Sequence, residues 1–217
     1  MSQIIVSQLT FSYDTIYDMI FENVSFQIDT DWKLGFIGRN GRGKTTFLNL
    51  LLGKYQYRGS ISSSVNFDYF PFEIEDEELT TMDVTKDIVA PFRVWEKEME
   101  ECLNNTGSSK HLEHYGQLQE LFQSHDGYII EELIEKEISK LHVDSSVLAR
   151  PFSTLSFGER TKIMLAALFL KKNNFLLIDE PTNHLDMEGR AVLADYLQTK
   201  KGFILVSHDR VFLDKCI

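Results

Sequence analysis

The spacing of apolar residues predicts short strands in the first third of the chain. Residues 3–9 and 65–70 are rich in apolar side chains, and apolar positions alternate with polar ones in residues 23–28, which is the period of a half-buried strand. A short apolar run at residues 33–37 predicts a further strand. Residues 44–52 then change to helical spacing and end at a glycine, as a glycine-capped helix does.

The middle of the chain has helical spacing and an excess of acidic residues. Apolar residues recur at helical intervals in residues 84–103, and residues 112–124 and 127–141 predict two more helices after a polar loop at 104–109. Between residues 73 and 101 there are eleven acidic and three basic side chains. We interpret this run as the solvated face of a helical lobe rather than as a binding tail.

The last third returns to strands that alternate with helices. Continuous apolar runs at residues 175–178 and 202–206 predict strands that are buried on both faces, as in a parallel sheet. Helical spacing at 161–170 and 186–198 predicts the helices that accompany them. This alternation predicts an α/β fold with a mostly parallel sheet, to which the first strands add an N-terminal antiparallel β part.

The same patterns predict two domains. Residues 1–72 and 156–217 would form the α/β core, and residues 73–155 would form an inserted helical lobe. The chain has 217 residues, which suits one full domain and a smaller second one.

Charge and composition exclude several classes of protein. The chain carries a net charge of −11 and has a pI of about 5.0, so it is not a general nucleic-acid coat, which would be strongly basic. No apolar run approaches the roughly 18 residues that span a bilayer, and no secretory signal is visible. Cys102 and Cys216 do not make a disulfide framework. We expect a cytoplasmic protein with no direct membrane insertion and no general nucleic-acid binding.

A phosphate-binding motif lies between the third predicted strand and the first predicted helix. Residues 38–45 read Gly-Arg-Asn-Gly-Arg-Gly-Lys-Thr and fit G-x-x-x-x-G-K-[ST] at every position. The glycines let backbone N–H groups surround phosphate oxygens, and the helix N-terminus adds partial positive charge. We expect Lys44 to reach the β- and γ-phosphates and the Thr45 hydroxyl to ligate Mg²⁺. The motif therefore predicts a P-loop NTPase core that binds ATP. The residues of this loop that we expect to hold the nucleotide are Gly38, Asn40, Gly41, Gly43, Lys44, Thr45 and Thr46.

Two acidic residues follow the buried run at 175–178. Asp179, at the end of the strand, is suited to hold Mg²⁺, and Glu180 is suited to polarise the attacking water as a general base. Such a pair can also be an ordinary polar turn, but a phosphate loop in the same chain favours the catalytic interpretation.

Residues 155–159, Leu-Ser-Phe-Gly-Glu, open a helix. Ser156 and Glu159 have the S-x-x-E spacing of a capping box. A helix N-terminus with Ser156 and Gly158 is also suited to bind an anion. The two interpretations are compatible.

Together, these motifs resemble the nucleotide-binding domain of ATP-binding cassette proteins, over nearly the whole chain. The phosphate loop, the signature-like residues 155–159, the Asp179-Glu180 pair and His208 occur in the order of that family. The resemblance implies that Tyr13 stacks on adenine and that His208 contacts the γ-phosphate. It also implies that Ser156 and Gly158 act on a nucleotide held by a second cassette.

A narrower resemblance points to one class within the family. Residues 179–186, Asp-Glu-Pro-Thr-Asn-His-Leu-Asp, and residues 207–210, Ser-His-Asp-Arg, are similar to the ABC-F class of tandem ATPases that work on the ribosome. Residues 9–14 and 150–155 are similar to antibiotic-resistance ribosome-protection proteins. The resemblance implies an Mg²⁺-dependent ATPase that is the N-terminal cassette of a longer chain and is weakly active as an isolated domain.

The sequence departs from the family pattern at two positions. Phe72 stands where the family usually has a glutamine that helps to hold Mg²⁺, and Phe157 stands at the first glycine of the signature. The competing interpretation is the ATPase subunit of a membrane transporter. A chromosome-structuring ATPase is disfavoured, because the insertion is too short for a long coiled coil. His111 and His114 resemble a metal-binding pair but have no further ligand nearby in the sequence.

Overall fold

The computed structural model describes residues 2–13, 19–38, 41, 43–104 and 109–217, and these residues form two compact units. The first unit comprises Met1–Phe72 and Asn173–Ile217, and the second comprises Glu73–Lys172. The division at residue 72 coincides with the predicted boundary. The return to the first unit comes after residue 172 instead of at residue 156, so helix α6 (Phe157–Leu170) is part of the helical unit.

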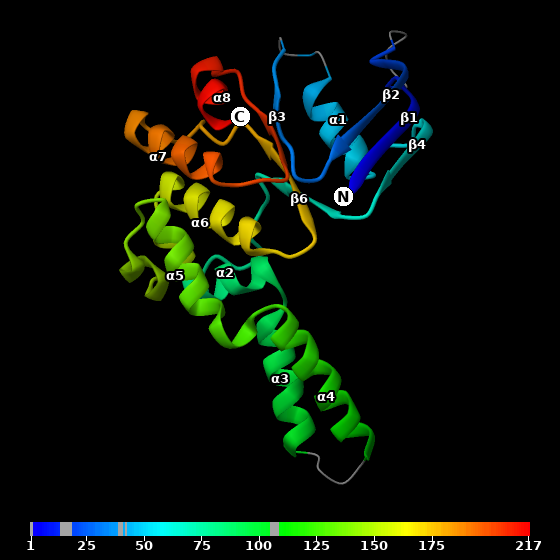
Figure 1. Ribbon diagram of the computed structural model, residues 1–217. Helices are drawn as coiled ribbons and strands as arrows, with labels where there is room; N and C mark the ends of the chain where they lie inside the picture. Colours follow the sequence, from blue (N-terminus) through cyan, green and yellow to red (C-terminus); the bar gives the residue numbers. More distant parts are fainter. Residues whose placement is uncertain (1, 14–18, 39–40, 42, 105–108) are drawn as a thin grey trace. The chain divides into compact units, whose positions relative to one another are not determined.

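The first unit contains two sheets, as the change in apolar spacing predicts. The antiparallel sheet has the order β2-β1-β4 (Figure 1). The parallel sheet has the order β3-β7-β6-β5. The antiparallel strands are β1 (Gln3–Phe11), β2 (Phe21–Asp29) and β4 (Arg58–Ser63). The parallel strands are β3 (Lys33–Phe36), β5 (Asn66–Phe70), β6 (Asn174–Asp179) and β7 (Phe203–Val206). An α/β fold with a parallel sheet and an antiparallel part is thus confirmed.

Helix α1 (Lys44–Leu51) joins the two sheets through one apolar core. Phe47 and Leu48 of this helix are buried in the same cluster as Val6 of β1 and Leu177 of β6. Because α1 starts directly after the phosphate loop, this burial holds the start of the helix beside the ends of the parallel strands.

The remaining helices of the first unit are α7 (Met187–Gln198) and α8 (Arg210–Cys216). Helix α8 and the residue after it come close to β3 at Gly35, where an added Cβ would lie 3.5 Å from a side-chain carbon of Leu213 and 3.3 Å from one of Ile217. A larger residue at Gly35 would therefore require the Ile217 side chain to shift.

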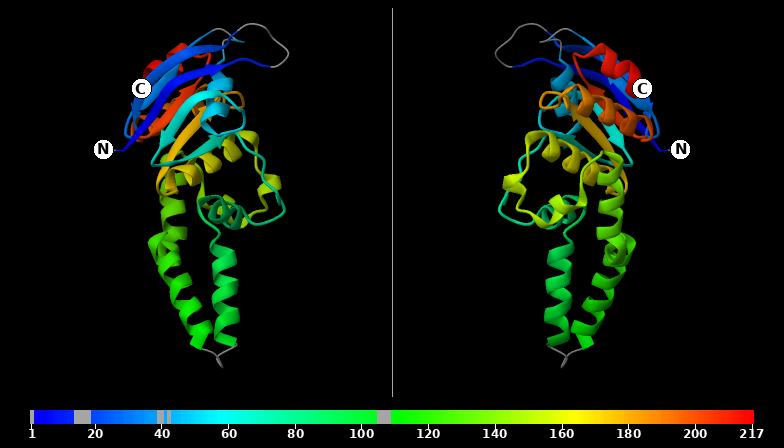
Figure 2. Two further views of the ribbon diagram at one scale, coloured as in Figure 1. Left: turned by 90° about the vertical axis from the view of Figure 1, so that its right-hand side faces the viewer. Right: turned by 90° about the vertical axis from the view of Figure 1, so that its left-hand side faces the viewer.

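The second unit is helical, as predicted. Its α-helices are α2 (Thr81–Val89), α3 (Phe92–Asn104), α4 (Ser109–Ser124), α5 (Ile130–Lys140) and α6. Three short 3₁₀ turns, η1 (Gly127–Ile129), η2 (Ser145–Ala149) and η3 (Phe152–Thr154), connect them. Helices α3 and α4 run side by side as a hairpin (Figure 2).

Aromatic side chains and one buried lysine stabilise the base of this hairpin. The ring of Phe92 on α3 lies 5.5 Å from that of Phe122 on α4. Lys86 of α2 is buried, and its ammonium group lies 3.5 Å from Glu96 and 3.3 Å from Glu131. A buried lysine needs such partners, so these contacts tie α2 to α3 and α5.

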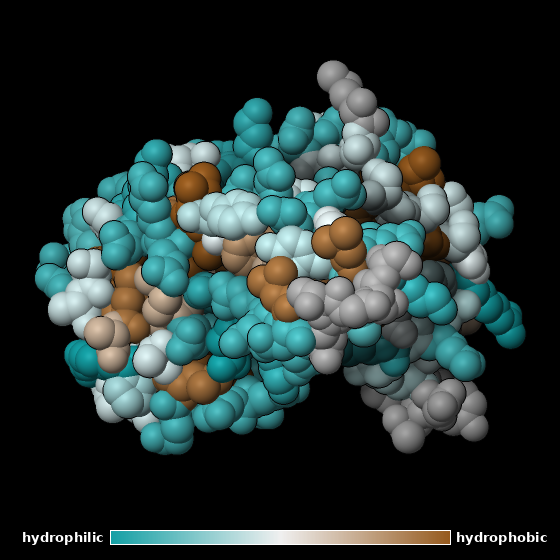
Figure 3. Space-filling view, turned by 90° about the horizontal axis from the view of Figure 1, so that it is seen from below, coloured by the Kyte–Doolittle hydropathy of each residue, from teal (hydrophilic) through white to brown (hydrophobic). Residues whose placement is uncertain are grey.

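Hydrophilic side chains predominate on the face that Figure 3 shows. In the view of Figure 3, hydrophobic side chains occur as separate patches among hydrophilic ones. Each helix in the described ranges is too short or too polar to cross a lipid bilayer.

Candidate functional site

Glycines set the geometry of the phosphate loop at the start of α1. Gly41 and Gly43 have φ angles of +78° and +84°, which glycine adopts without steric cost. An added Cβ at Gly43 would lie 2.6 Å from a side-chain carbon of Ile20. Both the backbone conformation and the close approach therefore require glycine at position 43.

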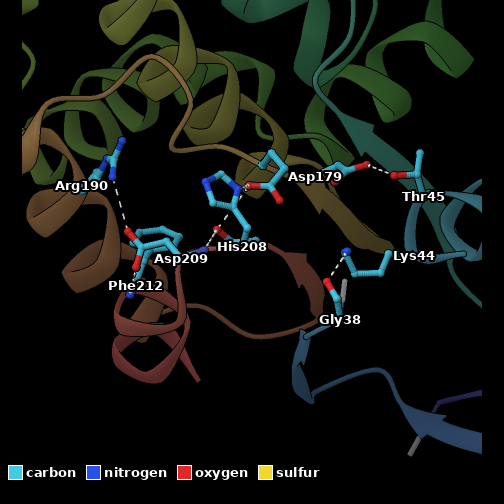
Figure 4. A network of polar contacts seen from close by, with 10 residues as sticks. Gly38, Lys44, Thr45, Asp179, Arg190, His208, Asp209 and Phe212 are labelled. Carbon is cyan, nitrogen blue, oxygen red and sulfur yellow. Dashed lines mark hydrogen bonds and ion pairs between the residues drawn. The ribbon is translucent and has the colours of Figure 1, made fainter. Parts of the chain in front are cut away.

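Lys44 is the first residue of α1 and lies across the mouth of the loop. Its Nζ donates a hydrogen bond to the carbonyl oxygen of Gly38 at 2.6 Å (Figure 4). The ammonium group is therefore held near the end of β3, on the same side as the start of the helix.

A carboxylate and two hydroxyl groups meet at the end of β6. Thr45 Oγ1 donates a hydrogen bond to Asp179 Oδ2 at 2.8 Å, and the Tyr69 hydroxyl donates to the same oxygen at 3.1 Å. Burial and the nearby charge of Asp179 raise the pKa of Tyr69 well above its ordinary value, so its phenol remains a proton donor at neutral pH.

These oxygens fit a magnesium ion. Mg²⁺ prefers oxygen ligands and is commonly bound by one or two protein carboxylates together with phosphate oxygens and water. Thr45 and Asp179 supply one hydroxyl and one buried carboxylate. The described ranges contain no group of three or more His, Cys, Asp or Glu side chains that could hold a metal without such help.

Glu180 and His208 form the other half of the site. Nδ1 of His208 lies 2.8 Å from Oε2 of Glu180, and Ser207 Oγ donates to the same oxygen at 3.4 Å. Glu180 has a φ angle of +51°, which is uncommon for residues other than glycine and tends to occur at functional sites. Its backbone N–H donates to the carbonyl of Val206 at 2.9 Å, which fixes this turn to β7.

A polar network behind His208 holds its segment in place. The backbone N–H of Asp209 donates to Ser207 Oγ at 3.1 Å, while the Asp209 carboxylate caps α8 by accepting from the backbone N–H of Phe212 at 3.0 Å. Arg190 of α7 lies 3.4 Å from the same carboxylate (Figure 4). The segment that carries His208 is therefore positioned by contacts with α7 and α8.

These groups surround a cavity of about 700 Å³. Its lining residues are Tyr13, Ile20, Gly41, Gly43, Lys44, Thr45, Thr46, Asp179, Glu180, Asn183, Val206 and His208. The structure therefore brings together nine of the predicted site residues. Gly38 contributes through its bond to Lys44, and Asn40 lies outside the described residues.

Tyr13 is held at one end of this cavity. Its hydroxyl forms a hydrogen bond with Thr46 Oγ1 at 2.9 Å, and its ring packs edge-on against Phe11 and Tyr55. Position and chemistry suit an aromatic contact for a ligand that enters the cavity.

Sequence reasoning missed three lining residues and one supporting residue. Ile20 is an apolar side chain outside the motifs. Val206 is the last residue of an apolar run and gives only a strand signal, and Asn183 belongs to the class-specific loop at residues 179–186. Tyr69 showed no signal beyond strand spacing. Its role depends on the pairing of β5 with β6, which places it near Asp179.

Ser156 and Gly158 belong to the second unit. Ser156 is the N-cap of α6, and the predicted capping box is confirmed: Glu159 N–H donates to Ser156 Oγ at 3.3 Å, and Ser156 N–H donates to Glu159 Oε2 at 2.8 Å. The Ser156 hydroxyl also donates to Glu159 Oε2, at 2.7 Å. This bond and the one from the Ser156 backbone N–H hold the pKa of Glu159 below its ordinary value. Phe157, next to the cap, is 68% exposed.

Arg160 fixes the loop that precedes α6. Its guanidinium binds the Glu77 carboxylate with two hydrogen bonds of 2.9 and 2.8 Å and donates to the carbonyl of Ser153 at 2.8 Å. Both bonds to Glu77 come from Nη1, and hydrogen bonds between charged groups are stronger than neutral ones. The start of α6 is therefore a rigid element of the helical unit.

Comparison with known proteins identifies the family. The sequence profile of the family described as "ABC transporter" matches residues 21–183, which include the phosphate loop, the signature-like residues and the acidic pair. The chain belongs to the ABC transporter family. It is an ATP-binding domain of that family, whose domains of this kind are ATPases.

Two relatives within the ABC family come from Bacillus subtilis (strain 168). The uncharacterized ABC transporter ATP-binding protein YfmM is 37% identical over 209 residues, which cover 91% of this chain and 40% of YfmM. The ribosome protection protein VmlR is 34% identical over 199 residues, which cover 90% of this chain and 30% of VmlR. The chain therefore spans less than half the length of either relative.

A solved structure supports the ABC fold. A structure described as a metal-chelate type ABC transporter in an inward-facing conformation superimposes with a TM-score of 0.65. It is 19% identical in sequence, and the match covers 99% of this chain and 76% of that one. At this identity the likeness concerns the fold alone.

Proposed function

We propose that this chain is the ATP-binding and ATP-hydrolysing cassette of a tandem ABC-F protein that acts on the ribosome. The observation that carries the catalytic part is the cavity at which Lys44, Thr45, Asp179, Glu180 and His208 converge. Each has the chemistry that hydrolysis of a nucleoside triphosphate needs. The similarity to the ribosome protection protein VmlR supports the ribosomal part.

Lys44 and the loop glycines would bind the phosphates. The Lys44 ammonium group donates to the Gly38 carbonyl, and a phosphate oxygen would be a stronger acceptor at nearly the same place. The helix N-terminus behind it adds favourable partial charge. Tyr13 and Ile20, which line the same cavity, would contact the adenine base.

Thr45 and Asp179 would hold Mg²⁺ beside these phosphates. A bound Mg²⁺ would neutralise the charge that develops on the transferring phosphoryl group. The protein's own contribution is the fixed distance between the Thr45 hydroxyl and the Asp179 carboxylate, which are joined by a 2.8 Å hydrogen bond.

Glu180 would take the proton from the attacking water. General bases of this kind contribute roughly 10²- to 10⁴-fold to the rate. The contact of 2.8 Å with His208 and the bond from Ser207 fix the Glu180 carboxylate in one orientation. His208, whose side chain is 67% exposed, remains accessible to the γ-phosphate.

The partner would be the second cassette of the same full-length protein. Ser156 and Gly158 lie at the start of α6, where a serine hydroxyl and backbone N–H groups suit a phosphate held by that cassette. Each cassette alone would lack half of a composite site, so the isolated chain would bind ATP weakly and hydrolyse it slowly. Closure of the pair around ATP would change how the protein engages the ribosome.

The cellular setting follows from the same proposal. A protein that acts on ribosomes works in the cytoplasm, and antibiotic resistance would be one outcome of that action. The acidic net charge of −11 disfavours general RNA binding. Contact with the ribosome would therefore use limited surfaces.

The test is co-sedimentation of the full-length protein with ribosomes. Changing Glu180 and the equivalent acid of the second cassette to glutamine should trap the closed state, so that the protein stays bound in ATP and is released in ADP. Glu22→Gln, on the exposed surface of β2, is the control that should behave as the parent does. A trapped form that ignores ribosomes and associates with a membrane subunit would replace this proposal with a transporter function.

A further inference from the structure

The pairing of β5 with β6 places Tyr69 beside the carboxylate of the magnesium site. In this parallel pair, Tyr69 lies opposite Leu177. Side chains alternate along a strand, so Asp179, two residues further along, projects from the same face as Leu177. Tyr69 and Leu177 both pack in the apolar core around α1, and Thr45 lies in the first turn of that helix.

Two donors therefore converge on one oxygen of Asp179. The Tyr69 hydroxyl donates to Oδ2 at 3.1 Å, and Thr45 Oγ1 donates to the same atom at 2.8 Å. Residues 70–72, Phe-Pro-Phe, have no side-chain oxygen or nitrogen. The Tyr69 hydroxyl is thus the last polar side-chain group that this strand offers before the chain passes into the helical unit.

The ring of Tyr69 is itself fixed. Lys54, which follows α1, places its Nζ 5.2 Å from the centre of the Tyr69 ring, a distance at which a cation is attracted to the aromatic face. The ring is also partly buried in the core around α1. Because the ring is already held in place, the hydroxyl can donate to the Asp179 carboxylate without a further loss of side-chain entropy.

We propose that Tyr69 is a positioning residue for the magnesium site of this ATPase, an inference that rests on the proposed function. Tyr69 is not a lining residue of the cavity, so it acts through Asp179. Its hydrogen bond fixes the carboxylate in one orientation and leaves the metal ligands pre-arranged. Groups that orient a metal ligand in this way typically contribute about 10- to 100-fold to metal affinity or activity.

The experiment measures ATP binding to the full-length protein as Mg²⁺ is increased, with a fluorescent ATP analogue as the probe. Tyr69→Phe keeps the ring and its contact with Lys54 and removes only the hydroxyl. It should raise the Mg²⁺ concentration at half-saturation by about tenfold or more, while binding of the analogue in EDTA and the thermal unfolding temperature stay unchanged. Tyr57→Phe, in the same unit but at a separate and smaller pocket, is the matched control and should match the parent.

The outcomes separate this inference from the proposed function. If Thr45→Ala raises the Mg²⁺ requirement and Tyr69→Phe does not, the role of Tyr69 is wrong and the ATPase site stands. If only Tyr69→Leu raises it, ring packing is responsible and the hydroxyl is not, which also overturns the inference. A parent protein that binds no ATP at any Mg²⁺ concentration overturns both.

Discussion

The two units of this protein use their polar side chains in opposite ways. In the first unit, Lys44, the adjacent Asp179 and Glu180, and His208 come from three separate segments and line one cavity. In the second unit, these charged side chains bind one another: Lys86 binds two glutamates, and Arg160 binds Glu77. The difference indicates that the first unit is arranged to act on a ligand, while these contacts of the second unit stabilise its own helices.

The same chemical change should therefore have different effects in the two units. Removing a charge at the cavity should alter catalysis or binding and leave stability unchanged. Removing a charge from one of the ion pairs within the second unit should lower the free energy of unfolding and leave ATP binding unchanged. The three predictions below test this contrast.

The largest effect is expected for Glu180→Gln. The amide cannot accept the proton of the attacking water, so ATP turnover of the full-length protein should fall by about 10²- to 10⁴-fold. Affinity for Mg·ATP should be retained, because the side chain keeps its size. Steady-state phosphate release and nucleotide binding, measured side by side, check both statements. Equal turnover in the parent and the variant would remove Glu180 from the mechanism.

A smaller effect is expected for Lys44→Ala. The change removes the charge-assisted hydrogen bonds to the phosphates, each worth about 1.5–3 kcal/mol, so ATP affinity should fall at least tenfold in a binding titration. The matched change in the second unit is Lys86→Ala, which removes a buried partner of Glu96 and Glu131. It should lower the free energy of unfolding by a similar 1.5–3 kcal/mol and leave ATP affinity unchanged. The reverse pattern would contradict the contrast between the units.

The smallest effect is expected for Glu159→Gln at the start of α6. Glutamine can keep the capping box, but the favourable charge at the helix N-terminus is lost, which costs about 0.3–1 kcal/mol. Since the pKa of Glu159 lies below its ordinary value of 4.5, its stabilising contribution is present above that pH and is lost as the pH falls through the lowered pKa.

Chemical unfolding at several pH values between neutrality and about pH 3 checks this third prediction. The difference in unfolding free energy between the parent and Glu159→Gln should shrink at low pH. A difference that stays constant would mean that the charge of Glu159 does not contribute. ATP turnover at the cavity of this chain should fall far less in Glu159→Gln than in Glu180→Gln.

Several elements could be predicted because a single local pattern specifies them. Strands β6 and β7 are continuous apolar runs, and all four residues of β7 are buried, as a strand covered on both faces requires. Helix α1 starts where the glycines of the loop end, and its predicted range of residues 44–52 agrees with the observed Lys44–Leu51. The S-x-x-E spacing of Ser156 and Glu159 predicted the capping box that the structure contains.

Other elements could not be predicted, because their partners determine them. Strand β4 reads Arg-Gly-Ser-Ile-Ser-Ser and has one apolar side chain. It forms a strand because it pairs with the edge of β1 that β2 does not occupy, for example Ile61 with Val6. Helix α8 is short and begins at a cap from Asp209. Phe212 and Leu213 are buried while Val211 is exposed, because α8 packs against α7 and Leu213 lies close to β3 at Gly35.

The sequence by itself determined the chemistry of this protein, and the tertiary structure decided which groups act together. The spacing of glycines, lysine and threonine defines a phosphate loop, since each requirement is local to a strand, a turn and a helix start. Thr45 and Asp179 are 134 positions apart, and Tyr69 and Asp179 are 110 apart. They meet because the strand order β3-β7-β6-β5 brings the ends of the parallel strands to one edge beside α1, and no local pattern encodes the order of strands in a sheet.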